Sequence, residues 1–159
     1  MRLKGIIDEV FQDYKKPSML LITFQCNWKC LTEAGLDISI CQNSELAKQK
    51  NIDVSYKKII ERYINNPITQ AIVIAGLEPM LQFEDILEFI KRFRKVCNDD
   101  VVIYTGYDYN EIKPEIEHLE KFNNIIVKFG RYKANSEKRF DDVLGVWLIS
   151  NNQYAIKIS

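Results

Sequence analysis

The chain has 159 residues, of which 47% are hydrophobic and 28% charged, a length and composition typical of one globular domain spanning residues 1–159. Because 22 basic and 22 acidic residues balance to a net charge of zero, nothing favours nucleic acid as a partner. No apolar run approaches the roughly 20 residues of a membrane span, and residues 1–9 lack the apolar segment of a signal peptide, so we expect a cytoplasmic protein without a membrane partner.

Hydrophobic periodicity predicts alternating strands and helices along the chain. Strands are expected at 3–11, 19–24, 70–75, 101–104 and 125–129, and helices at 54–65, 83–96 and 109–121. The first of these helices has an apolar stripe, and Asp53 is its expected N-cap. Two short strands, 146–149 and 154–158, follow, and the four polar residues Ser150–Gln153 between them fit a turn or hairpin loop.

Strands that alternate with helices pair in parallel through crossover connections, which predicts an α/β fold with a mostly parallel sheet. Ligands of such sheets bind beyond the C-terminal ends of the strands. Four unusual segments follow these ends and should converge there: the cysteine segment after strand 19–24, Gly76-Leu77-Glu78-Pro79, Thr105-Gly106-Tyr107 and Gly130-Arg131. Glycine also serves ordinary turns, but the convergence of four such segments favours a binding site.

Three of the four cysteines, Cys26, Cys30 and Cys41, fall in the irregular stretch 25–41. In a reducing compartment, clustered cysteines favour metal or redox chemistry over disulfides, and a single histidine makes histidine-based sites a poor fit. Three thiolates can hold three corners of a 4Fe–4S cubane and leave its fourth iron open to a small molecule. Reduced cysteines without metal, and zinc held by three cysteines and water, remain alternatives. Cys97 ends a helical stripe and is expected to be an ordinary buried thiol.

Together these motifs resemble the radical S-adenosylmethionine enzymes. The resemblance rests on a strand that leads into C-x3-C, on a third cysteine in Cys41-Gln42-Asn43, and on a strand followed by G-x-E-P at Gly76–Pro79. Thr105-Gly106-Tyr107 and Ser150-x-Asn152-Gln153 extend it to the small activating proteins of anaerobic ribonucleotide reductase, which are about this length. The resemblance covers nearly the whole chain, from Ile6 to Ile156.

The sequence departs from the family pattern around the cysteines. The second and third cysteines of the family are normally two residues apart, whereas ten residues intervene here. The aromatic residue before the third cysteine is Ile40, the second glycine of G-G-E-P is Leu77, and Gln25 stands before Cys26 in place of glycine. Because doubling a loop costs only about 0.6 kcal/mol of closure entropy, the insertion Leu31–Ile40 need not abolish cluster binding. We expect it to change how adenine is held.

The resemblance implies that Cys26, Cys30 and Cys41 are catalytic and ligate a 4Fe–4S cluster in the loop 25–43. Its open iron would chelate S-adenosylmethionine, whose reductive cleavage yields methionine and a 5′-deoxyadenosyl radical. The implied cofactor-binding residues are Gly76, Leu77, Glu78, Pro79, Thr105, Gly106 and Asn152. From the residues alone, Glu78 fits a helix N-terminal acid equally well, Thr105-Gly106 fits a turn, and Asn152 fits a polar hairpin turn.

The implied fold is a partial, open (β/α) barrel, because 159 residues supply too few units for the closed eight-fold barrel of about 250 residues. Its open side suits a macromolecular substrate. The expected function is therefore an activase that takes hydrogen from a glycine of the anaerobic ribonucleotide reductase large subunit, with flavodoxin or ferredoxin as electron donor. The alternatives are a divergent radical enzyme acting on another protein, peptide or small molecule, and a non-catalytic module that holds zinc or an iron–sulfur cluster.

Overall fold

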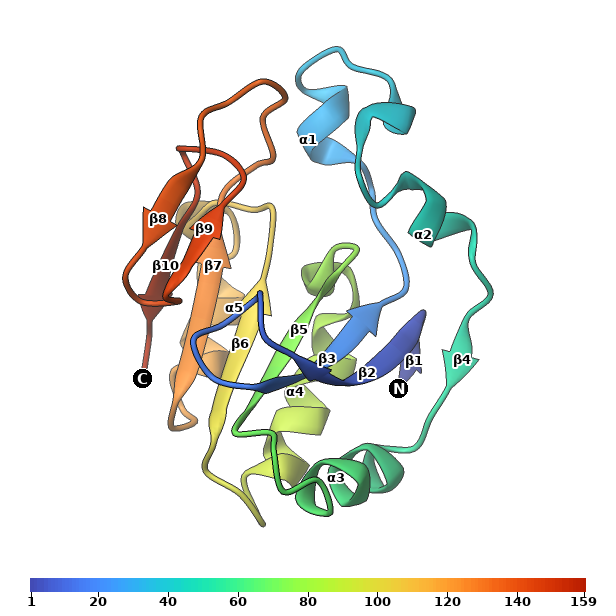
Figure 1. Cartoon of the computed structure of the whole chain (residues 1–159), viewed down its shortest axis with the longest axis vertical. Helices are drawn as coiled ribbons and strands as arrows, with labels where there is room; N and C mark the ends of the chain where they lie inside the picture. Colours follow the sequence, from blue (N-terminus) through green and yellow to red (C-terminus); the bar gives the residue numbers. More distant parts are fainter.

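Apolar strands separated by amphipathic helices build the centre of the protein, which a computed structural model describes over all residues, Met1–Ser159 (Figure 1). Four parallel strands form the middle of a six-stranded sheet, and an antiparallel strand borders each side. In spatial order the strands are β10 (Tyr154–Lys157), β7 (Ile125–Phe129), β6 (Asp100–Tyr104), β5 (Ala71–Gly76), β3 (Ser18–Thr23) and β2 (Gly5–Val10). The prediction of an α/β fold with a mostly parallel sheet is confirmed.

All three crossover helices pack on the same face of this sheet. They are α3 (Tyr56–Ile64), α4 (Phe83–Phe93) and α5 (Lys113–Leu119); α4 and α5 are drawn behind the sheet in Figure 1. Alternate strand residues such as Ile72 and Ile74 point toward them and are fully buried in a core cluster of 20 residues. No helix combines the length and apolarity that crossing a membrane requires.

The opposite face of the sheet carries a smaller core. Ala71 and Val73 alternate with the helix-facing residues of β5 and pack in a cluster of eight buried residues. A hairpin of β8 (Arg139–Asp141) and β9 (Val146–Leu148) contributes to this cluster through Leu148. Figure 1 shows the hairpin on one side of the upper end of the sheet and the cysteine segment on the other.

The cysteine segment contains short helices that its irregular sequence does not predict. They are α1 (Lys29–Thr32), a 3-10 helix (Ile38–Ile40) and α2 (Ser44–Lys48), followed by β4 (Ile52–Asp53), which pairs with β1 (Arg2–Leu3). Two further 3-10 helices, Pro79–Gln82 and Tyr109–Glu111, precede α4 and α5.

Three predicted details are wrong for identifiable reasons. Ser55, not Asp53, caps α3, because Asp53 lies in β4 and pairs with Arg2 at 3.1 Å. The predicted helix 109–121 is interrupted before α5, since Pro114 lacks the N–H that would continue it. Of the two alternatives for Ser150–Gln153, the turn is confirmed, since the chain turns at 151–152, but the hairpin is wrong: β9 pairs with β8, whereas β10 joins the central sheet beside β7.

Substitution of Gly76 by alanine should destabilise the chain at the end of β5. Gly76 has φ +103°, and a Cβ there would lie 2.6 Å from Cγ2 of Ile22. We expect Gly76→Ala to lower the free energy of unfolding in urea by about 2–4 kcal/mol through strain and overpacking. Gly35 is the matched control, because it also has a positive φ, +65°, but a Cβ added there would have no atom within 4 Å. Gly35→Ala should therefore lower the free energy of unfolding by only about 1 kcal/mol. Equal losses would contradict the clash.

Candidate iron–sulfur centre

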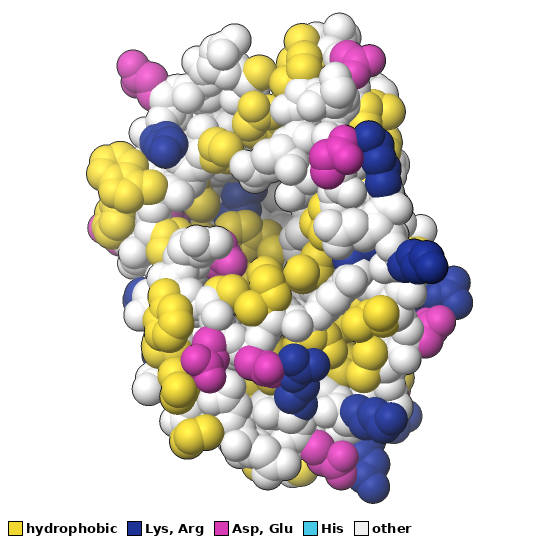
Figure 2. Space-filling view, turned by 45° about the vertical axis from the view of Figure 1, so that its right-hand side comes forward, with side chains coloured by type: hydrophobic (Ala, Val, Ile, Leu, Met, Phe, Trp, Pro, Cys, Tyr) yellow, Lys and Arg dark blue, Asp and Glu magenta, His cyan; other side chains and the backbone are white.

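The C-terminal ends of the parallel strands open into one cavity of about 570 Å³. Its wall takes residues from the segments after all four parallel strands, among them Cys26, Glu78, Gly106 and Gly130. Figure 2 shows the hollow with hydrophobic side chains around it and a basic side chain inside it. The predicted convergence of these segments at one edge of the sheet is therefore confirmed.

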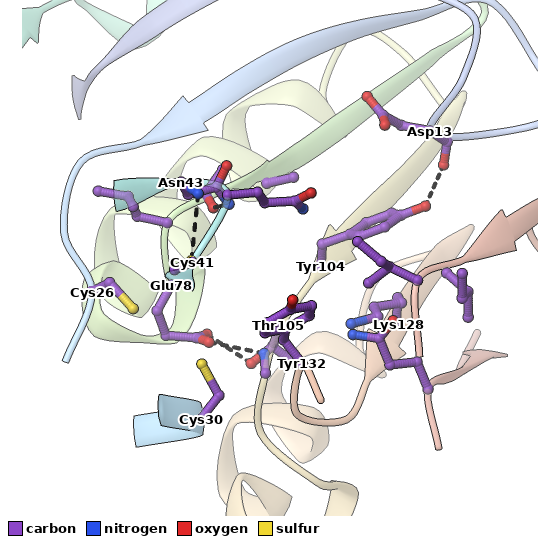
Figure 3. Close-up of a pocket in the computed structure, with 18 of the residues that line it drawn as sticks. Asp13, Cys26, Cys30, Cys41, Asn43, Glu78, Tyr104, Thr105, Lys128 and Tyr132 are labelled. Carbon is purple, nitrogen blue, oxygen red and sulfur yellow. Dashed lines mark hydrogen bonds between the residues drawn. The ribbon is translucent and has the colours of Figure 1, made fainter. Parts of the chain in front are cut away.

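Cys26, Cys30 and Cys41 all line this cavity, and none forms a disulfide. Cys26 follows β3, Cys30 lies in α1, and Cys41 ends the 3-10 helix of the insertion. The sulfur atoms of Cys26 and Cys30 turn toward each other in Figure 3. Asn43 ties the returning chain to β5, since its Nδ2 donates to the carbonyl oxygen of Gly76 at 2.6 Å. The insertion thus folds outward and brings the third thiol back to the cavity.

Burial raises the pKa of two of the cavity thiols, Cys26 and Cys30. It raises the pKa of Cys26 to about 11, against the lowering effect of the Trp28 N–H, which donates to the sulfur at 3.3 Å. The nearby Glu78 carboxylate and the other two thiols raise it further. Burial, followed by the charge of Cys41, likewise raises the pKa of Cys30. Binding a metal as thiolates must therefore displace protons.

The three thiols of the cavity are not gathered around a single point that one metal ion could occupy. No three His, Cys, Asp or Glu side chains lie close enough together to hold one metal ion. A zinc ion needs all its sulfur ligands about 2.3 Å from one point. The thiolates of a cubane bind different irons, so they surround a shared space without meeting at a point. Cys26, Cys30 and Cys41 line one cavity, as the ligands of a shared cluster would.

Glu78 is buried at the cavity wall with only 7% of its surface exposed. Its carboxylate accepts hydrogen bonds from Thr105 Oγ1 at 2.7 Å, from the Gly106 N–H at 2.9 Å and from the Met80 N–H at 3.1 Å. Burial raises its pKa, and these hydrogen bonds oppose the rise. Glu78 therefore caps the 3-10 helix Pro79–Gln82 and also faces the cavity, so the two interpretations of this residue are compatible.

The structure does not bring every predicted residue to the cavity wall. Leu77, Thr105 and Gly106 line it, whereas Pro79 begins a 3-10 helix and lies outside the wall. Asn152 is also outside the wall; its Nδ2 donates to the Arg131 carbonyl at 3.0 Å, and its buried Oδ1 has no partner. The predicted buried thiol, Cys97, is half-buried against the main core.

Lys128 is a cavity residue that the sequence patterns did not single out. Its side chain comes from β7 and is 6% exposed. The ammonium donates one hydrogen bond, to the Gly130 carbonyl at 3.2 Å, and forms no ion pair. Burial lowers its pKa to about 8, although Glu78 and Cys30 act in the opposite direction. The signal was present in the sequence as one lysine inside the apolar strand Ile125–Phe129.

Comparison with known proteins agrees with this site. Residues 18–156 match the model of the family described as 4Fe-4S single cluster domain, and the chain belongs to this family. Neither the curated proteins nor the solved structures gave a match. The matched range includes all three cavity cysteines, and cysteine thiolates are the usual ligands of such clusters. The chain is therefore a 4Fe–4S protein.

The three cavity thiols should be individually necessary for the cluster. Wild-type protein reconstituted without oxygen should contain about four irons and four sulfides per chain, and replacing Cys26, Cys30 or Cys41 by alanine should remove most of both. Cys97→Ala is the matched control and should keep the full content, because Cys97 lies outside the cavity wall. The iron and sulfide content of each variant is measured by chemical analysis. An intact cluster in Cys41→Ala would exclude Cys41 as the third ligand.

Replacing Lys128 by methionine should stabilise the apo chain near neutral pH. Below the folded pKa of about 8 the ammonium is charged in both states, so the folded chain bears the whole cost of burying it. Between that pKa and the ordinary value of 10.5 the unfolded chain binds more protons, so stability rises with pH. We expect Lys128→Met to gain up to ~3 kcal/mol in urea unfolding at pH 7.

The gain should shrink as the pH rises from 8 toward 10.5, because the folded chain then buries a neutral Lys128, and it should vanish above 10.5, where Lys128 is neutral in both states. Comparison of variant and wild type at each pH cancels the titration of other groups. Lys138→Met is the control, since Lys138 touches the same cavity but is exposed, and it should change stability by less than about 0.5 kcal/mol. A gain for Lys128→Met that is the same at pH 7 and pH 10 would contradict the assignment.

Proposed function

We propose that this chain is a radical S-adenosylmethionine activase that generates a glycyl radical on anaerobic ribonucleotide reductase. The observation that carries the proposal is that three thiols, not four, line the cavity beyond the strand ends. A 4Fe–4S cluster held by three thiolates keeps one iron without a protein ligand. When bound, such a cluster supplies the electron that cleaves the sulfonium of S-adenosylmethionine.

The charges in the cavity complement the amino-acid end of S-adenosylmethionine. Glu78 offers a carboxylate to its ammonium group, while Thr105 and Gly106 hold that carboxylate in place. Lys128 offers a buried ammonium with free donors to its carboxylate. Both groups lie in the same wall, and neither has an ion-pair partner within the chain. An ordered, low-dielectric site of this kind binds a zwitterion through groups that are already desolvated.

The open sheet supports a protein substrate. The parallel strands have their helices on one face only, and the sheet ends in the edge strands β2 and β10 instead of closing. The hairpin residue Trp147 lines the cavity and is nevertheless 67% exposed, so the cavity reaches the surface there. A glycine-bearing loop of the reductase could approach the cleaved cofactor from this side, and flavodoxin or ferredoxin would supply the electron.

The insertion favours a second candidate, a radical enzyme with a different acceptor. Ile38 and Ile40, both in the insertion beside Cys41, are each 43% exposed. Exposed apolar side chains next to a site favour contact with another polypeptide. The same cluster and cofactor would then act on a different protein or peptide.

Reduced, reconstituted protein should convert S-adenosylmethionine to 5′-deoxyadenosine and methionine, because the free iron and the charged wall bind the substrate together. Cys30→Ala should yield none above background, and Cys97→Ala should match the wild type. Chromatography of the products measures both. Absence of 5′-deoxyadenosine from protein with a full cluster would overturn the radical chemistry. A glycine-centred radical signal on a candidate reductase after this reaction separates the proposed acceptor from any other.

Equilibrium dialysis of reconstituted protein tests the role of Lys128 in this binding. S-adenosylmethionine should bind at least tenfold tighter than its decarboxylated analogue, which lacks the group that Lys128 and the open iron would bind, since a hydrogen bond to a charged group alone contributes roughly 1.5–3 kcal/mol. Lys128→Met should lower the affinity for S-adenosylmethionine about tenfold and leave the analogue unaffected. Equal affinities of the wild type for both compounds would show that Lys128 does not bind the carboxylate.

A further inference from the structure

One arginine joins three separate segments around the cysteines. The Arg131 side chain follows β7, is 15% exposed, and uses all of its N–H donors. Nε and Nη2 donate to the Glu33 carboxylate at 2.9 and 3.2 Å. Nη1 and Nη2 donate to the Glu111 carboxylate, each at 2.7 Å, and Nη1 also donates to the Gly106 carbonyl at 2.6 Å.

Lys29 completes this arrangement, and we call Arg131, Glu33, Glu111 and Lys29 the Arg131 clasp. The Lys29 ammonium lies 2.7 Å from Glu111 and 3.7 Å from Glu33, so two cations face two carboxylates. Both cations also lie over the ring of Tyr107, at 5.1 and 5.3 Å from its centroid. A planar guanidinium can donate two hydrogen bonds to each of two carboxylates and one to a carbonyl, whereas a lysine ammonium has only three donors.

The clasp holds the helix that carries Cys30. Helix α1 has only four residues, and a helix this short is not stable by itself. Lys29 and Glu33, the clasp residues of this segment, stand on either side of Cys30 in the sequence. The long-range ion pairs of the clasp therefore help to stabilise this short helix.

The clasp also connects α1 to the wall that orients Glu78. The Gly106 carbonyl accepts from Arg131, and its N–H donates to the Glu78 carboxylate. One residue of the loop after β6 thus links the thiol segment to the buried acid. Movement of α1 away from the cavity would require breaking these bonds together.

We propose that Arg131 is a positioning residue for the iron–sulfur cluster. It holds α1 so that the Cys30 thiol faces Cys26 across the cavity before the metal binds. The inference rests on cluster binding by this family and is independent of any reaction with S-adenosylmethionine. It predicts a site that is ordered in the apo chain and a cluster that is slow to dissociate.

The test compares Arg131→Gln, Arg131→Lys and Glu33→Gln with Arg92→Gln. Arg92 is the matched control, because it pairs with Glu88 at 2.7 Å within α4 and not with the cysteine segment. Two measurements are made: amide hydrogen exchange of residues 29–36 in the apo chain, and the rate of iron loss from reconstituted protein to a chelator. The free energy of unfolding in urea is measured for each variant alongside them.

Arg131→Gln should speed both exchange in 29–36 and iron loss by about tenfold, because it leaves two carboxylates without their main partner. Arg131→Lys should have rates close to those of Arg131→Gln, since one ammonium cannot replace a guanidinium shared by two carboxylates. Glu33→Gln removes only the ion pair between Arg131 and the α1 segment, and it should also raise both rates. This variant keeps the test valid if Arg131→Gln does not fold. Arg92→Gln should match the wild type in both rates.

Wild-type exchange and iron-loss rates in Arg131→Gln and Glu33→Gln would overturn the proposal. So would a rise in exchange that extends equally to α4, because the effect would then be a general loss of stability. Failure of the proposed activase reaction leaves these measurements unchanged, since neither requires S-adenosylmethionine. The two proposals therefore fail separately.

Discussion

The parallel register of the central strands is the constraint on which the site depends. Thr23 of β3 pairs with Gly76 of β5, so the chain leaves both strands at the same height. The Glu78 N–H then donates to the Gln25 carbonyl at 2.8 Å, which joins the first cysteine segment to the loop after β5. With this register, Cys26 and Glu78 share one cavity although more than 50 residues separate them. A slip by one residue would turn the strand side chains to the opposite faces.

The site combines this rigid frame with buried charges that do not stabilise the fold. Lys128 is buried without an ion pair, and the buried Glu78 carboxylate is satisfied only by neutral donors. Burying such groups costs free energy unless a partner arrives. Proteins often accept such a loss of stability at functional sites, where the ligand supplies the missing partner. The placement of both groups beside the three thiols fits a cavity built to hold a charged molecule next to a cluster.

Local sequence patterns predicted the strands and the candidate site residues, whereas pairings and contacts between residues far apart in the sequence could not be predicted. Strand 125–129 was predicted at its observed bounds because four of its five residues are apolar. The three cysteines were found from their clustering in one segment, and Glu78 from the resemblance of Gly76–Pro79 to a family motif. The pairing of β9 with β8 could not be predicted from a polar turn alone. The contact of Arg131 with Glu33 spans 98 positions, and no local pattern indicates it. Asn152 lies outside the cavity wall because its amide is used to hold the Arg131 carbonyl.

The central claim is that one iron of the cluster has no protein ligand. Mild oxidation of the reconstituted protein should remove that iron and leave a 3Fe–4S form, and adding ⁵⁷Fe should refill the vacant corner with a Mössbauer label. The account predicts that S-adenosylmethionine then changes the Mössbauer parameters of the labelled iron. A cluster that loses no single iron, or a labelled iron that does not respond to S-adenosylmethionine, would contradict it.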